Sequence, residues 1–111
     1  MNLTMEVRTA ASTAVVTCSG SLVLGERIDA LRATVYELLY RYERVVLDLE
    51  NVHRIDGAGL GVIAGAAAMA VIGGRNLGVA GASGVVDESL TMTRLKTAVD
   101  CYSTTRRCAA A

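Results

Sequence analysis

The chain has 111 residues, which is enough for one domain with a hydrophobic core and too few for two. Basic and acidic residues both number 11, so the formal net charge is zero and the strongly basic surface of a nucleic-acid-binding protein is not expected. Hydrophobic residues make up 52% of the chain, which favours a packed domain spanning residues 1–111 over a disordered chain.

The cysteines and the single histidine form no pattern that would hold a metal or a disulfide. Cys18, Cys101 and Cys108 are not spaced as CxxC, and His53 has no metal-ligand companion at motif distance. The N-terminal segment lacks the apolar run of a signal peptide. We therefore expect free thiols, no metal or other cofactor, and a location in the reducing cytoplasm.

The segment from Gly57 to Gly74 has no charged residue and, at 18 residues, reaches the lower length limit of a transmembrane helix. Six of these residues are glycine and six are alanine, so the segment is only weakly apolar on a membrane-insertion scale. We expect a buried helix of a soluble protein rather than a membrane span.

The first predicted elements are two strands and a helix. Met5–Ala10 alternates polar and apolar residues and is predicted to be a strand. A second strand is predicted over Thr13–Ser19 after a turn at Ala11–Ser12, which indicates an antiparallel hairpin. A loop is expected over Gly20–Gly25. A helix follows over Glu26–Arg41, and its core-facing stripe is predicted to contain Ile28, Leu31, Val35, Leu38, Leu39 and Tyr42.

The rest of the chain alternates strands and helices. Val45–Leu49 is almost continuously apolar, as expected of a central strand in a parallel sheet. A helix is predicted from Ala58 to a stop at Gly73–Gly74. The remaining predicted elements are a strand over Asn76–Ala80, a helix capped by Ser83 or Gly84 and running through Leu95, a strand over Ala98–Tyr102, and a terminal helix capped by Ser103.

This order of elements predicts the α/β class, because strands that alternate with helices form a mostly parallel sheet with right-handed crossovers. The opening pair of strands, joined by a short turn, must be antiparallel. We expect a small mixed sheet of four to five strands, mostly parallel with an antiparallel N-terminal hairpin, packed with about four helices.

A glycine-rich segment, Arg54–Gly61, joins the predicted central strand to the helix that follows it. Sheets of this class place functional groups at the carboxyl ends of their parallel strands. Asp56 is expected to cap the helix by accepting hydrogen bonds from the amides of Ala58 and Gly59. The three glycines of the segment would let another backbone come close. A capped helix start with only a structural role would have the same residues.

A phosphate or nucleotide site is not expected at this segment. Its glycines fit neither the GxGxxG nor the Gly-Lys-Ser/Thr pattern. The Asp56 carboxylate would also repel a phosphate at a helix N-terminus that otherwise favours anions. Because no nucleophile–base pair, paired loop carboxylates or metal-ligand cluster is found in the sequence, we expect a binding protein and not an enzyme.

The string Ile55–Gly61, with its Asp-x-x-Gly-Leu-Gly core, resembles the signature of the STAS domain as found in bacterial anti-anti-sigma factors, which are anti-sigma factor antagonists. Three flanking segments are similar to the family in the same order. Gly20–Arg32 is similar to its loop and first helix, Ile72–Leu77 to the exit of its second helix, and Leu90–Val99 to its third helix and final strand. The resemblance covers essentially the whole chain and implies one STAS domain.

The resemblance implies a protein that binds a kinase-type anti-sigma factor, a histidine-kinase-like serine kinase, and so frees a sigma factor. In the family, the position of Ala58 usually has a serine or threonine whose phosphorylation blocks binding. Alanine has no oxygen to accept a phosphate, so this off-switch is expected to be absent. The aspartate often found before the first helix is also replaced, by Val23. The hydroxyls of Ser12, Ser21 and Ser83 lie outside the motif, and we do not expect them to replace it.

The second helix is predicted to present an uncharged surface, where a surface helix normally has charged residues. Such a face suggests a contact surface for a partner protein or for a second copy in a homodimer. Small residues that are merely inconspicuous would give the same pattern. The predicted core-facing residues are Leu60, Ala64, Ala67 and Val71, and the opposite face contains Ala58, Val62, Gly65, Ala66, Met69 and Gly73.

Two other functions remain open on the sequence. STAS-like subunits also serve membrane transport complexes, including lipid-import assemblies, as accessory subunits whose same helix face docks on an ATPase. A small-molecule enzyme or sensor would need a ligand-sized pocket, which a small sheet under an alanine- and glycine-rich helix disfavours. Direct membrane insertion is not expected in any of these roles. The predicted partner-binding residues are Val23, Glu26, Asp56, Gly57, Ala58, Gly59, Leu60, Gly61, Val62, Ala66 and Met69.

Overall fold

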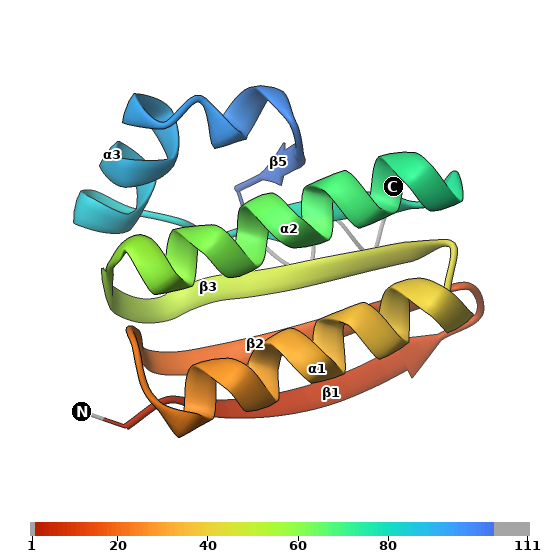
Figure 1. Cartoon of the computed structure of the whole chain (residues 1–111), viewed down its shortest axis with the longest axis horizontal. Helices are drawn as coiled ribbons and strands as arrows, with labels where there is room; N and C mark the ends of the chain where they lie inside the picture. The colour runs from red at the N-terminus through yellow and green to blue at the C-terminus, as the bar shows by residue number, and fades with distance from the viewer. Residues whose placement is uncertain (1, 104–111) are drawn as a thin grey trace.

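A five-stranded mixed sheet forms the centre of the protein (Figure 1). The computed structural model describes residues 2–103. The strands lie in the sheet in the order of the sequence and are β1 (Thr4–Ala10), β2 (Thr13–Leu22), β3 (Arg44–Ile55), β4 (Asn76–Ala80) and β5 (Asp100–Tyr102). The helices are α1 (Glu26–Arg41), α2 (Gly57–Gly73) and α3 (Gly84–Met92), with a short 3-10 helix, η1 (Leu95–Thr97), before β5.

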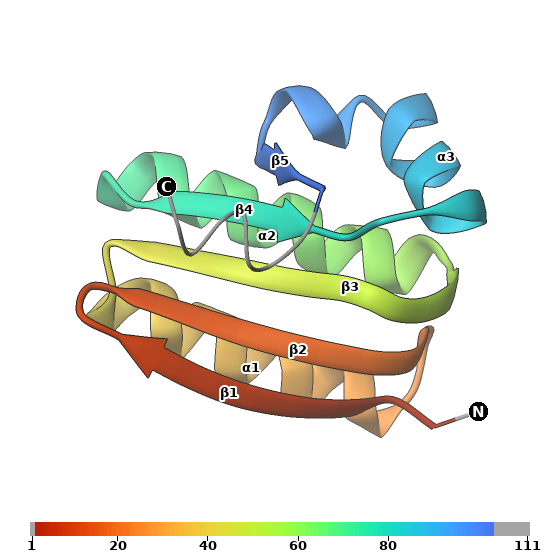
Figure 2. The ribbon, with the colours of Figure 1, turned by 180° about the vertical axis from the view of Figure 1, so that it is seen from behind.

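The strand pairing confirms the predicted α/β class. β1 and β2 pair antiparallel across the turn at Ala11–Ser12, whereas β2, β3, β4 and β5 are parallel neighbours. α1 and α2 lie side by side in front of the sheet in Figure 1, and the reverse view shows the strands in front of these helices (Figure 2). The predicted third helix is shorter than expected, because the chain turns at Arg94 with a φ of 61° and Leu95 starts η1. The predicted helix after Ser103 lies outside the described residues.

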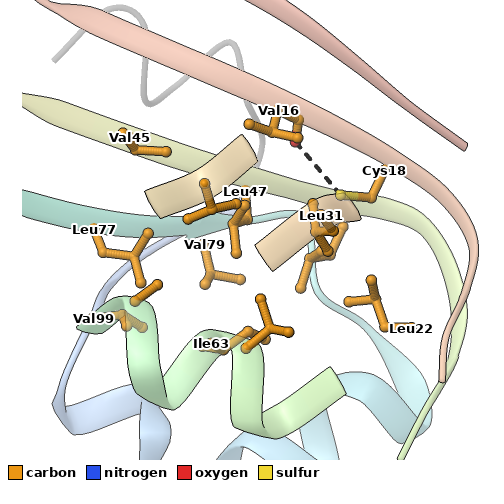
Figure 3. Close-up of a cluster of buried hydrophobic side chains, with 14 of the residues drawn as sticks. Val16, Cys18, Leu22, Leu31, Val45, Leu47, Ile63, Leu77, Val79 and Val99 are labelled. Carbon is orange, nitrogen blue, oxygen red and sulfur yellow. Dashed lines mark hydrogen bonds between the residues drawn. The ribbon is translucent and has the colours of Figure 1, made fainter. Parts of the chain in front are cut away.

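A large hydrophobic core fills the space between the sheet and the helices (Figure 3). Its burial is the main contribution that stabilises the folded chain. Cys18 belongs to this core, where its thiol lies 3.8 Å from the carbonyl oxygen of Val16, and burial raises the thiol pKa to about 12. The other core residues labelled in Figure 3 are Leu22, Leu31, Val45, Leu47, Ile63, Leu77, Val79 and Val99.

Two strands are longer than the sequence pattern predicts. β2 continues to Leu22, so the loop before α1 is Val23–Gly25 and not the predicted six residues. The strand bends at Gly20, which has a φ of 104° and whose added Cβ would collide with the carbonyl oxygen of Asn2. β3 continues through polar residues to Ile55 because it stays paired with β2 along its length. Both extensions bring the ends of β2 and β3 to the same edge of the sheet.

The predicted core-facing side of α2 is right for Ala67, which is buried, and wrong for Ala64 and Val71. The buried residues include Val62 and Ala66, which had been placed on the outer face, while Ala64 and Val71 are exposed. The physical reason is that α2 has no charged or polar residue to mark which side faces water, so the sequence allowed several rotations of the helix. Within residues 2–103, no helix is long and apolar enough to cross a membrane. The exposed positions of α2 are Gly57, Gly61, Ala64, Ala68, Val71, Ile72 and Gly73.

Candidate functional site

The junction between β3 and α2 is shorter than predicted. β3 ends at Ile55 and α2 begins at Gly57, so Asp56 is the single residue between them. The segment Arg54–Gly61 is therefore the end of a strand and the first turn of a helix, not a loop. Its position at the carboxyl edge of the sheet is where parallel α/β folds place functional groups.

The Asp56 carboxylate joins the start of α2 to the loop before α1. Its Oδ1 accepts hydrogen bonds from the backbone N–H groups of Ala58 at 2.9 Å and Gly59 at 3.1 Å, which confirms the predicted cap. Its Oδ2 accepts a third bond, at 3.0 Å, from the N–H of Leu24, and this bond was not predicted. The N–H of Asp56 itself donates to the carbonyl oxygen of Leu22 at 3.1 Å. One side chain therefore holds two segments together.

These bonds also affect the charge of Asp56. The Leu24 N–H, followed by the N–H groups of Gly59 and Ala58, lowers the pKa of the Asp56 carboxyl below its ordinary value, because each bond stabilises the charged form. Asp56 is therefore ionised at neutral pH, and its negative charge is directed at backbone donors of the same chain.

The glycines of the first turn of α2 differ in whether the packing of the chain requires them. A Cβ at Gly59 would collide with the carbonyl oxygen of Leu22 and would lie 2.8 Å from the Ile55 side chain, so glycine is needed for α2 to pack against the end of β2. At Gly57 and Gly61 an added Cβ would meet nothing within 4 Å. Packing within the chain does not require glycine at these two exposed positions, which leaves room for the close approach of another molecule.

Apart from Asp56 and Glu26, the side chains around this junction are small or apolar. Ala58 is partly exposed in the first turn of α2, and Leu24, held beside it through Asp56, is 80% exposed. Val23 is partly buried, and Glu26 is exposed at the start of α1. We define the Asp56 surface as the junction formed by Val23–Glu26 and Asp56–Gly61. Its exposed apolar contact area comes mainly from Leu24.

The cavities described among residues 2–103 lie away from the Asp56 surface. One of about 240 Å³ is lined by Asp87, Lys96 and Cys101 together with residues of β4 and α3. Another, of about 160 Å³, lies beside the C-terminal end of α2. Both are smaller than typical sites for drug-sized ligands. In the same part of the chain, no group of three His, Cys, Asp or Glu residues could hold a metal ion.

A family model described as "Mlab, STAS domain" matches residues 5–100, which is most of the chain. The chain belongs to the STAS domain family. No curated protein matches it significantly.

Solved structures share the STAS fold with this chain. A Thermotoga maritima protein assigned as an anti-sigma factor antagonist has a TM-score of 0.86 at 20% identity, covering 96% of this chain and 92% of that one. The Bacillus cell fate determinant SpoIIAA in its phosphorylated form has a TM-score of 0.78 at 13% identity, covering 96% and 97%. A sulfate transporter family protein from Wolinella succinogenes has a TM-score of 0.75 at 13% identity, covering 93% and 86%. At these identities the likeness shows the fold.

The STAS fold brings most of the predicted partner-binding residues to the Asp56 surface and leaves Val62, Ala66 and Met69 outside it. Within that surface, Gly59 is buried in the packing of α2 and Leu60 is partly buried. Val62 and Ala66 are fully buried and offer no contact surface, so their prediction as partner-binding residues is wrong for the folded chain. Met69 is partly buried, far along α2 from Ala58.

Leu24 was not among the predicted partner-binding residues, although its neighbours Val23 and Glu26 were and the loop that contains all three was expected to contact a partner. The signal in the sequence was a large aliphatic residue between Val23 and Gly25, in a segment predicted to be a loop. Of the other hydroxyls, Ser21 is buried, and Ser12 lies in the β1–β2 turn at the opposite end of β2. Ser83 is exposed before α3.

Proposed function

We propose that this STAS domain is an anti-sigma factor antagonist that binds a kinase-type anti-sigma factor in the cytoplasm through the Asp56 surface. The observation that carries the proposal is the Asp56 carboxylate, which accepts hydrogen bonds from Leu24, Ala58 and Gly59 and so makes one rigid surface from two segments. The structural neighbours named as anti-sigma factor antagonists support it. The chain acts by stoichiometric binding and not by catalysis.

The chemistry of the surface suits protein binding. Leu24 supplies an exposed aliphatic side chain, and the exposed Gly57 and Gly61 allow a partner backbone to come close. The charge of Asp56 is already paired with three N–H groups, so covering it with a partner leaves no unpaired carboxylate oxygen. Glu26 adds a charge at the exposed rim, where it affects association rate and specificity more than affinity.

Ala58 makes this antagonist insensitive to the phosphorylation that acts at its position in the family. A phosphate would add roughly −1.5 to −2 charges within reach of the Asp56 carboxylate, and alanine has no oxygen to receive it. The domain therefore stays in its binding form. Control of its activity comes from its amount, from the partner, or from another interaction of its surface.

A second function is compatible with one comparison, the neighbour named as a sulfate transporter family protein, which links the fold to membrane transport. In this function the STAS domain is an accessory subunit that docks on the ATPase of a membrane transport complex. It would use the same surface, because a STAS domain without a phosphorylatable hydroxyl can serve as a fixed docking module. The two functions differ in the partner that is bound.

Affinity capture from the native cytoplasm tests both functions. The tagged domain is compared with Leu24→Glu, which places a charge on the Asp56 surface, and with Ala10→Glu, which places the same charge on exposed β1 at the far end of the sheet. We expect an ATP-binding anti-sigma kinase with the wild type and Ala10→Glu, and its loss with Leu24→Glu. Recovery of transporter subunits would replace the first function with the second. Equal recovery with all three baits would show that the Asp56 surface is not the interface.

A further inference from the structure

The exposed side of α2 is apolar from one end of the helix to the other. Its outward positions, about one every turn, have no charged or polar side chain. α2 lies in the middle of the helix layer, between α1 and the α3–η1 segment (Figure 1). A helix in this position normally presents charged residues to water. We call these positions the α2 stripe; they are Gly57, Gly61, Ala64, Ala68, Val71 and Ile72.

The side chains of the α2 stripe are small at the N-terminal end of the helix and large at its C-terminal end, and we call these the small end and the large end. From Gly57 to Ala68 it contains only glycine and alanine, whereas Val71 is 77% and Ile72 is 86% exposed. The Arg75 guanidinium, beside the end of α2, donates a hydrogen bond to the Tyr40 carbonyl oxygen at 3.4 Å, so the C-terminal end of α1, where Tyr40 is 82% exposed, lies close to the large end. Large exposed apolar residues grouped in this way mark interaction surfaces.

We propose that the α2 stripe binds the α2 stripe of a second copy, with the two helices antiparallel about a twofold axis. A twofold interface uses the same patch on both subunits, so the patch must be complementary to itself. With the axis at the midpoint between Ala64 and Ala68, Val71 of each copy lies over Gly61 of the other. The large end of each stripe thereby fills the shallow region left by the small end of its partner.

Charge and area both favour a second copy as the occupant of the α2 stripe. The α2 stripe has no charge to pair and no polar side chain to satisfy, so it selects an apolar partner surface with large residues spaced to match its glycines, and this chain has such a surface. α2 has 17 residues and is about 25 Å long. Two such faces, with Tyr40 at their ends, bury on the order of 1,000 Å² in total, which is the lower end for specific interfaces. The dimer is therefore reversible.

Self-association would also affect the Asp56 surface, since Gly57 and Gly61 belong to both surfaces. At high concentration the dimer would cover part of the Asp56 surface and compete with partner binding. Self-association would then limit the activity of a domain that lacks a phosphorylatable residue at position 58. This consequence rests on the proposed function, but the dimer itself does not, and its test requires no partner protein.

Sedimentation velocity of the full chain over a wide concentration range tests the dimer. We expect a reversible monomer–dimer equilibrium in the wild type and a monomer in Ala64→Glu at every concentration. Ala30→Glu is the matched control, because Ala30 is exposed on α1 and turned away from the Tyr36 side that meets α2. It should associate as the wild type does. A wild type that stays monomeric throughout, or Ala64→Glu that associates like Ala30→Glu, overturns the proposal.

Gly61→Leu provides an independent variant. A side chain at Gly61 meets nothing within 4 Å in the monomer, so the variant should fold with an unchanged or higher melting temperature. In the antiparallel dimer it would collide with Val71 of the second copy and should weaken association at least tenfold. Association that is unchanged by Gly61→Leu would exclude this arrangement, whatever the oligomeric state of the wild type.

Discussion

At the scale of single residues, Asp56 and Ala58 make different contributions to the candidate site. Asp56 provides structure, because its Oδ1 caps α2 by accepting the N–H groups of Ala58 and Gly59, while its Oδ2 accepts the N–H of Leu24 in the loop before α1. Ala58, at the position where the proposed function places the family's phosphorylation, has no oxygen to accept a phosphate. The first contribution can be tested in the isolated domain, and the second only with a partner.

Ala58→Asp should weaken partner binding, because it adds a negative charge beside Asp56 in a surface that the partner must cover. The expected loss is roughly 2–5 kcal/mol if that charge is buried in the interface, or about thirtyfold or more in Kd. Titration calorimetry with the captured partner measures it, with Ala10→Asp as the control. Ala58→Ser should bind like the wild type until a cognate kinase phosphorylates it. If Ala58→Asp binds as tightly as the wild type, position 58 lies outside the interface.

Asp56→Asn should lower the melting temperature at neutral pH. Asparagine can keep one oxygen for the Ala58 and Gly59 amides, but its NH₂ group cannot accept the bond from Leu24. The folded-state pKa of Asp56 is lowered, so its stabilisation is present above the unfolded pKa of about 3.9 and is lost as the pH falls through the folded value. Thermal melts from pH 7 to pH 3 should therefore show the difference in melting temperature between the two proteins narrowing in acid. A difference as large at pH 3 as at pH 7 would contradict this assignment.

At the scale of elements, we expect substitution by alanine to have opposite effects on stability at two glycines of α2. Gly61→Ala should stabilise the domain by roughly 0.5–1 kcal/mol, because alanine is the better helix former and the position is open. Gly59→Ala should destabilise it by about 1–3 kcal/mol, since its Cβ collides with the carbonyl oxygen of Leu22. Urea unfolding at low protein concentration compares them. Two variants that both stabilise the domain would mean that α2 is free to move away from β2.

The helices also show what the sequence could predict. α1 has its predicted bounds because apolar and charged residues alternate at helical spacing, and Ile28, Leu31, Val35 and Leu39 are buried as expected. α2 has its predicted end, at Gly74 with a φ of 68°, because glycine adopts that conformation readily. Its rotation could not be predicted, since a helix of glycine, alanine and aliphatic residues has no polar side. The uncharged outer face was expected, and different residues form it.

At the scale of the whole molecule, the two ends of the sheet differ in what they support. The carboxyl ends of β2 and β3 meet at the Asp56 surface, while the β1–β2 turn lies at the opposite end (Figure 1). The motif around Asp56 could be found in the sequence because it is local. The bond from Leu24 to Asp56 spans 32 residues, and it forms only because β2 and β3 both extend beyond their predicted ends. No local pattern predicts such a contact.

This difference between the two ends predicts the outcome of matched insertions. A Gly-Ser pair inserted between Ala11 and Ser12 lengthens an exposed hairpin turn, which costs about 0.6 kcal/mol in loop closure and leaves the Asp56 surface intact. The same pair inserted between Val23 and Leu24 displaces the Leu24 N–H from Asp56 and separates the two segments of the surface.

Both insertion variants should keep the circular dichroism spectrum of the wild type, and only the second should lose binding to the captured partner. If the hairpin insertion alone abolished binding, the interface would lie at the β1–β2 end. If neither did, the hydrogen bond from Leu24 would be a feature of the fold with no part in recognition.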